Sequence, residues 1–169
     1  MHNRLPARTS LLLALALAVG PGAGCPTLPA EVCGLSTADP RVADRHLTAT
    51  RDGQPFDVEA SYAPGARATI VAGPLTLALA RDEEGSATDD LVARAVFPIC
   101  VRVGERGERR GSAALDGAGA ASDADHTGSV ALLRDDWGLL VGRFQLQLVD
   151  AAGAVTTFTD GAFRLPTKP

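Results

Sequence analysis

The chain has 169 residues, of which 46% are hydrophobic and 21% are charged, and its formal net charge is −4. This apolar fraction argues against a disordered chain, and the length fits one domain with a core of its own. The excess of acidic residues argues against nucleic acid as a partner, because phosphate contacts need clustered lysine and arginine. Lys168 is the single lysine of the chain.

The N-terminus has the pattern of an export signal. Arg4 and Arg8 precede an uninterrupted apolar run over residues 11–19, which ends at Gly-Pro-Gly in residues 20–22. A basic start followed by a short apolar segment is typical of a signal peptide. The run is too short for a permanent membrane span, which needs about 20 apolar residues.

Residues 22–25, Gly-Ala-Gly-Cys, resemble the lipobox of bacterial lipoproteins, in which small residues precede a cysteine that is acylated and becomes the new N-terminus. The resemblance implies that residues 1–24 are a lipoprotein signal peptide and that Cys25 carries a lipid. The mature chain would then have 145 residues, with 14 basic against 20 acidic side chains. The competing pattern is Ala-Leu-Ala at residues 16–18, which predicts ordinary secretory cleavage and a secreted protein.

The three cysteines are Cys25, Cys33 and Cys100. If Cys25 is acylated, the other two form an even pair in an oxidising compartment, which predicts a disulfide between Cys33 and Cys100. Such a bond closes a loop of about 68 residues and is worth about 4 kcal/mol by chain-entropy reasoning. Two free buried thiols are the alternative. A metal site is not indicated, because no Cys-x-x-Cys or Cys/His spacing is present.

In the first half of the mature chain, the sequence changes near residue 46 from an aperiodic segment to alternating apolar and polar residues. Residues 25–45 contain three prolines and no periodicity, and they predict a tether and a lead-in loop. Alternation of apolar and polar residues then predicts strands, with hairpin turns at Asp52-Gly53 and at Gly73-Pro74. The predicted strands cover residues 47–51, 56–62, 68–72 and 75–80.

The middle of the chain gives a weaker signal. Residues 82–90 hold five acids and predict a solvated loop. Residues 91–103 are apolar enough for a strand, in which Pro98 implies an edge or a bulge, and a short helix over residues 89–96 is the alternative. The charged and Gly/Ala-rich stretch over residues 104–126 predicts a loop.

Alternation returns in the last third, where Phe144, Leu146 and Leu148 are expected to face the core. Together with the earlier strands this gives eight or nine short strands, and no 3.6-residue periodicity supports a helical bundle. We therefore expect an all-β domain over residues 46–169, an antiparallel β-sandwich, with a closed β-barrel as the alternative. The strands expected here cover residues 128–134, 139–149, 155–159 and 162–165, with turns at residues 135–138, 150–153 and 160–161.

This region resembles a group of uncharacterised bacterial lipoproteins with a C-terminal β-sandwich domain. Three segments carry the likeness: G-x-F-x-L-x-L at residues 142–148, T-x-G-x-F at residues 159–163, and Gly-Ser-Val-Ala-Leu at residues 128–132. The resemblance implies the sandwich fold and the lipoprotein address. It implies no activity.

Candidate sites in the sequence are few. Asp123, Asp125 and Thr127 match the opening of a calcium-binding loop, but position 12 of that loop is Arg134 where an acid is required, so we expect no metal and no cofactor. His46 and His126 are the mature histidines, and no catalytic motif surrounds either one.

The aromatic side chains also give little indication of a binding site. Trp137 and Tyr62 are single representatives of their kinds in the chain, too few for an aromatic sugar platform. For Trp137 at a predicted turn, packing back over the end of the sandwich is favoured over a partner contact. The sequence thus favours a non-enzymatic binding or structural module of the cell envelope. It would be anchored to a membrane by its lipid, face the periplasm or the cell surface, and have an envelope protein as a further partner. A carrier of a small apolar ligand in a barrel cavity and a hydrolase are the alternatives.

Overall fold

The computed structural model describes residues 29–65, 67–81, 92, 96–104, 109–115, 127–135 and 138–168. Every regular element within these ranges is a β-strand, so the predicted all-β class is confirmed. No helix suited to crossing a lipid bilayer is found among the described residues. The strands are β1 (Glu31–Val32), β2 (Leu35–Ser36), β3 (His46–Arg51), β4 (Gln54–Ala63), β5 (Arg67–Ala72), β6 (Leu75–Arg81), β7 (Ile99–Val103), β8 (Arg109–Leu115), β9 (Thr127–Asp135), β10 (Leu139–Val149) and β11 (Val155–Pro166).

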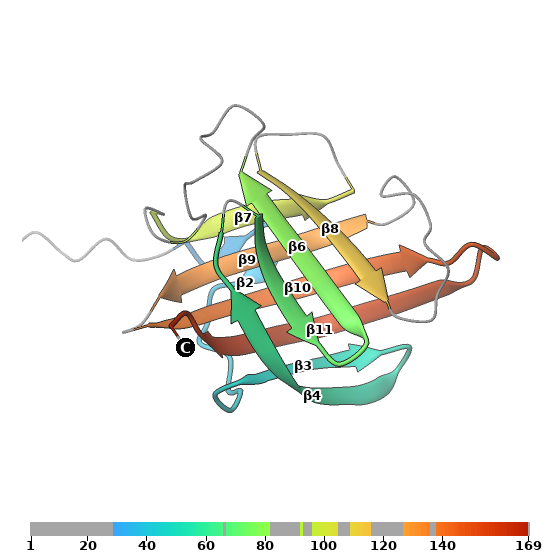
Figure 1. Ribbon diagram of the computed structural model, residues 1–169, viewed down its shortest axis with the longest axis horizontal. Coiled ribbons are helices and arrows are strands. Elements are labelled where there is room, and N and C mark those ends of the chain that lie inside the picture. The colour runs from blue at the N-terminus through green and yellow to red at the C-terminus, as the bar shows by residue number, and fades with distance from the viewer. Residues whose placement is uncertain are drawn as a thin grey trace, which may run out of the picture.

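Nine of the described strands form one closed barrel in the order β10-β11-β3-β4-β5-β6-β8-β7-β9 (Figure 1). Of the two architectures that the sequence left open, the structure has the closed barrel, not the sandwich placed first. All neighbouring pairs are antiparallel except β7 and β8, which run parallel and share two register pairs. β7 closes the barrel by lying between β8 and β9, so that neither edge of the sheet is left open as in a sandwich.

The early hairpins have the predicted turns. Asp52 and Gly53 both have positive φ, 48° and 79°, and join β3 to β4 as a two-residue turn of the kind that suits the twist of a hairpin. Residues 73–74 also form a two-residue turn, which joins β5 to β6, but only Gly73 has a positive φ, 56°. β4 pairs with β3 through its first half and with β5 through its second half, and this handover turns the sheet around the barrel.

The alternating apolar residues point into the barrel and fill it. Phe144, Phe158 and Phe163 are fully buried, and their rings contact one another with centroids 6.4 Å apart for Phe144 with each of the other two. The predicted inward face of β10 is confirmed, since Leu146 and Leu148 are also buried. The buried cluster consists of Leu47, Ala60, Ala68, Ile70, Ala72, Leu75, Leu77, Leu79, Val92, Ile99, Val101, Val103, Ala113, Val130, Leu132, Leu140, Phe144, Leu146, Leu148, Phe158, Phe163 and Leu165.

Two Gly-x-Phe segments pack against each other on β10 and β11. Gly142 pairs with Phe163, and Phe144 pairs with Gly161. Each ring therefore lies over the glycine of the opposite strand, where a Cβ would collide. A Cβ on Gly142 would lie 2.7 Å from Phe163 Cε2, and one on Gly161 would lie 2.6 Å from Phe144 Cδ1. Aromatic rings packed over cross-strand glycines are a known device for fixing strand register.

Two sequence predictions about element boundaries are wrong. Asp160-Gly161 does not separate two strands, because β11 runs through it with a register shift between Thr159 and Ala162 and with Asp160 at φ 52°. The stretch over residues 104–126 is not all loop, since it contains β8. That strand was missed because its inward positions carry small residues, Gly111 and Ala113, rather than large apolar ones.

The strand expected over residues 91–103 is shorter than predicted, since β7 begins at Ile99, directly after Pro98, whose peptide bond with Phe97 is cis. The acidic loop at residues 82–90 lies outside the described residues, as does most of the alternative helix over residues 89–96.

Candidate functional site

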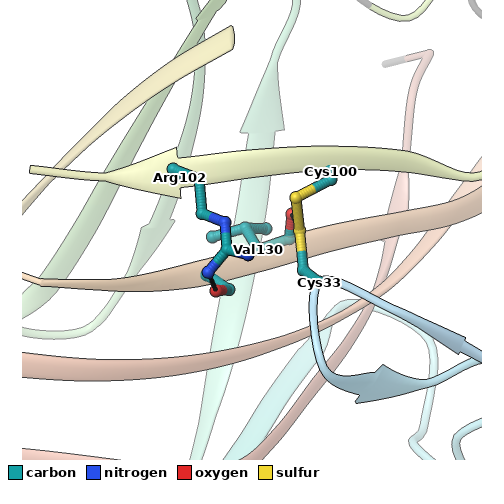
Figure 2. Close-up of a disulfide and its surroundings, with 5 residues drawn as sticks. Cys33, Cys100, Arg102 and Val130 are labelled. Carbon is teal, nitrogen blue, oxygen red and sulfur yellow. Dashed lines mark hydrogen bonds between the residues drawn. A yellow bond between two sulfur atoms is a disulfide. The ribbon is translucent and has the colours of Figure 1, made fainter. Parts of the chain in front are cut away.

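Residues 29–45, which we call the strap, lie along the outside of the barrel. The strap begins with the small hairpin of β1 and β2, turned at Cys33 and Gly34, both of which have positive φ. Cys33 forms a disulfide with Cys100 of β7, with 5.5 Å between the two Cα atoms, and this is the pair predicted from the sequence (Figure 2). The Sγ atom of Cys33 also lies 4.0 Å from the carbonyl oxygen of Val130, so the hairpin reaches across β9.

The register shows what the strap covers. Cys100 pairs with Ala131 of β9, which pairs with Arg143 of β10, so all three side chains lie on the outer face. Ala131 has no exposed surface although it faces outward, and β2 packs against β10. The hairpin therefore covers an apolar part of the outer wall formed by β7, β9 and β10. Arg102, on the same face of β7, donates to the hydroxyl of Ser129 at 3.2 Å.

Three arginines, one from each of β9, β10 and β11, contact successive parts of the strap. Arg143 donates from Nε and Nη2 to the carbonyl oxygen of Ala38, at 3.2 and 3.1 Å. Arg134 forms an ion pair with Asp39 at 2.7 Å, and Arg164 forms one with Asp44 at 2.8 Å. The first contact of the strap, at Cys33, is with β7 and the last, at Asp44, is with β11, so the strap crosses the wall between these two strands before it enters β3.

The strap also buries apolar surface between two of these ion pairs. Val141 lies between Arg134 and Arg164 in register, faces outward and is fully buried. Pro40 of the strap is buried too. The predicted tether and lead-in loop over residues 25–45 is thus, from residue 29 on, a packed part of the domain. Sequence reasoning missed this because the partners of the strap lie about 70 to 120 residues later in the chain.

The larger of two described surface hollows is a groove of about 480 Å³ at one end of the barrel. It opens where β4 leaves β3, beside the end of β11. Arg45, with φ 66°, joins these elements through its backbone: its N–H donates to the carbonyl oxygen of Arg164 at 2.7 Å, and its own carbonyl accepts from Ala60 at 2.6 Å. The lining consists of Arg45, Glu59, Ala60, Ser61, Tyr62, Ala63, Pro64, Pro166, Thr167 and Lys168.

The groove has an apolar floor and a charged rim. Tyr62 packs against the buried cluster from its half-buried position, which assigns this side chain to the groove floor. Within the described part of the chain, neither Arg45 nor Lys168 makes an ion pair, and Glu59 is the one carboxylate among the lining residues. The local balance of two cations to one anion is opposite in sign to the acidic chain as a whole.

His46 has an aspartate partner that the sequence did not reveal. Its Nδ1 atom lies 2.8 Å from Oδ1 of Asp57, on the outer face of β3 and β4. The two side chains are exposed, and neither lines the groove. An aspartate that holds an imidazole is part of several hydrolytic sites, but a nucleophile and a water-excluding pocket are needed as well. Neither of the two described hollows is lined by this pair.

The remaining candidates have little structural support. Thr127 is the first residue of β9 and is exposed, whereas Asp123, Asp125, His126, Trp137 and Cys25 lie outside the described residues. No group of three metal-ligating side chains occurs among the residues that the structure describes. A second, shallower hollow of about 210 Å³ lies over β9, β10 and β11, with Gln145, Gln147 and Thr157 among its polar lining.

Over the residues that the structure describes, the protein is a closed β-barrel of nine strands, with a strap that a disulfide holds on its wall and a groove at one end. No protein family, no curated protein and no solved structure matches the chain. Its function is therefore inferred from the residues and geometry described above.

Proposed function

We propose that this chain is an exported lipoprotein, anchored by a lipid on Cys25, that serves as a non-enzymatic binding or structural module of the bacterial cell envelope. The observation that carries this proposal is the disulfide between Cys33 and Cys100. Disulfides of this kind persist in oxidising compartments and are rare in the cytosol. The bond also uses the two cysteines that remain when Cys25 is acylated, and the resemblance of residues 22–25 to a lipobox points the same way.

The proposal is tested by the intact mass of the protein isolated from an exporting bacterium. We expect a chain that begins at Cys25, is heavier by its acyl groups, and is lighter by two hydrogens than the reduced form. A Cys25→Ser variant should lose the acyl mass and leave the membrane fraction. Recovery of the unprocessed polypeptide of 169 residues from the soluble cytoplasm would contradict the proposal.

The two alternative functions have less support. A carrier of an apolar ligand needs an open interior, whereas the buried cluster of side chains fills the described barrel and both described hollows lie at its surface. A hydrolase needs the His46 and Asp57 pair to face a pocket, but both side chains are exposed on the outer wall. A binding or structural role at the surface agrees best with these observations.

Within this role, we propose that the groove accepts an extended segment of a partner that combines apolar and acidic side chains. The apolar floor suits apolar side chains of the partner. The rim cations Arg45 and Lys168 suit acidic side chains, because neither cation makes an ion pair with a described residue. The volume of about 480 Å³ is in the range of pockets that hold small ligands or a few side chains.

Two blocked peptides test the groove: one of alternating leucine and glutamate, and one of alternating leucine and lysine. The acidic peptide should shift the amide resonances of Ser61 and Thr167, and the basic one should not. In an Arg45→Glu/Lys168→Glu variant, binding should weaken about tenfold, because exposed ion pairs contribute up to about 1 kcal/mol each. Arg41→Glu, an exposed charge change on the strap, is the control. Equal binding of both peptides, or of neither, would contradict the assignment.

A further inference from the structure

The position of the strap fixes where the barrel is attached to the segment that precedes it. The hairpin is closed at its base, where the Thr37 hydroxyl donates to the carbonyl oxygen of Pro29 at 2.5 Å and the Thr37 N–H donates to that of Ala30 at 3.0 Å. Only four residue steps separate Pro29 from Cys25. Four steps of fully extended chain reach at most about 14 Å. An anchor on Cys25 therefore holds the base of the hairpin close to the membrane.

The strand order identifies the wall that such an anchor holds. The hairpin lies on the outer face of β7, β9 and β10, which are consecutive in the barrel. β4 and β5 stand on the opposite side of the nine-strand ring. Figure 1 shows the strap, in blue, behind β9, with β6 and β8 crossing in front of the wall that it covers. A short attachment on one wall leaves the opposite wall turned away from the bilayer.

The disulfide is the strongest of the contacts that keep this attachment short. The ion pairs of Asp39 and Asp44 are partly exposed, and such pairs contribute up to about 1 kcal/mol each. If the strap left the wall, the connection would run from Cys25 to His46, where β3 begins, over 21 residue steps. Its contour length would be about 70 Å and its root-mean-square reach about 25 Å.

We propose that the disulfide between Cys33 and Cys100 orients the barrel on the membrane, so that the wall of β7, β9 and β10 faces the lipid headgroups and the wall of β4 and β5 faces away. This inference rests on the proposed lipid anchor. It assigns an interaction surface, the strap-bearing wall, and its partner, a bilayer surface held close by a short connection. Loss of the bond would free the barrel to rotate and to move farther from the bilayer.

Fluorophores on the two walls test this orientation. Gln145 is exposed on the outer face of β10, and Val71 is 44% exposed on β5. Gln145→Cys and Val71→Cys allow labelling in separate proteins, because Cys25 is acylated and the other two cysteines are bonded. The proteins are placed on phosphatidylcholine vesicles whose headgroups carry a nitroxide quencher. Quenching should be stronger at residue 145 by about twofold or more, because the two walls are at least the ~10 Å of packed sheets apart.

The same measurement in a Cys33→Ser/Cys100→Ser background should lose most of this difference between the two labels. Equal quenching at residues 145 and 71 in the oxidised protein would overturn the proposed orientation. If intact mass shows no acyl group, Cys25 is coupled to a maleimide-bearing lipid before reconstitution, while the disulfide is kept. The fluorophores are then attached to an azide-bearing amino acid at residue 145 or 71 in place of cysteine, so that Cys25 is the one free thiol. The orientation is then tested with a chemical anchor, and failure of the natural lipid anchor is distinguished from failure of the orientation.

Discussion

Replacing Gly142 by valine is expected to destabilise the barrel by about 3 kcal/mol, which is the upper part of the range for overpacked cores. A Cβ at this position would lie 2.7 Å from Phe163 Cε2 and 2.8 Å from the carbonyl oxygen of Ala131, so both neighbouring strands have to move. A loss of this size is a large share of the 5–15 kcal/mol that typically stabilises a domain. Denaturant unfolding, followed by circular dichroism, measures the change.

Two further variants show whether the packing of the ring over the glycine is the cause. Gln145→Val introduces the same β-branched residue at an exposed position of the same strand and should change the stability little. Gly142→Ala should lower the free energy of unfolding less in a Phe163→Leu background than in the natural protein, since part of the collision is with the Phe163 ring. If Gly142→Val unfolds at the same denaturant concentration as the natural protein, the packing described for this pair is wrong.

Removing the disulfide is the second change with a large expected effect. Cys33→Ser/Cys100→Ser should lower the free energy of unfolding by about 4 kcal/mol, because the bond closes a long loop in the unfolded chain. The loop includes β3 to β6, so the effect extends beyond the strap to the barrel as a whole. The denaturant midpoint should fall, and the folded variant should keep its β-sheet spectrum.

The natural protein under reducing conditions is the matched control for this variant, and the two should unfold at similar denaturant concentrations. Hydrogen exchange separates the two parts of the domain: amides of the strap should exchange faster in the variant, while those of β10 and β11 stay protected until global unfolding. An unchanged midpoint in the double variant would show that the bond contributes little to stability.

The fold was predictable where apolar and polar residues alternate. On β10 the inward positions carry Phe144, Leu146 and Leu148, and the period of two predicts both the strand and its buried face. β8 was not predicted, because its glycine, alanine and serine residues show no alternation of large apolar and polar side chains. The bulge in β11 was not predicted either, because an Asp-Gly pair predicts a turn in most contexts, whereas here the strand continues through the pair.

The candidate site was less predictable than the fold. Counting the cysteines predicted the pairing of Cys33 with Cys100 once the lipobox resemblance had set Cys25 apart. Nothing in the sequence near Asp39 indicates that its partner is Arg134, or that Arg45 and Lys168 lie at one groove. Such contacts join residues about 100 positions apart, and their identity depends on which strands become neighbours.

The sequence by itself therefore determined the all-β class and the inward faces of the alternating strands, because these follow from local periodicity. The cysteine pair followed from counting once the lipobox resemblance set Cys25 apart. The tertiary structure decided between sandwich and barrel, since closure depends on β7 pairing with both β8 and β9. The tertiary structure also shows that residues 29–45, which the sequence predicted as a tether and lead-in loop, are a strap on the barrel wall. The ion pairs and the apolar contacts of the strap form only because the closed sheet brings distant segments of the chain together. No local sequence pattern predicts which distant segments become neighbours.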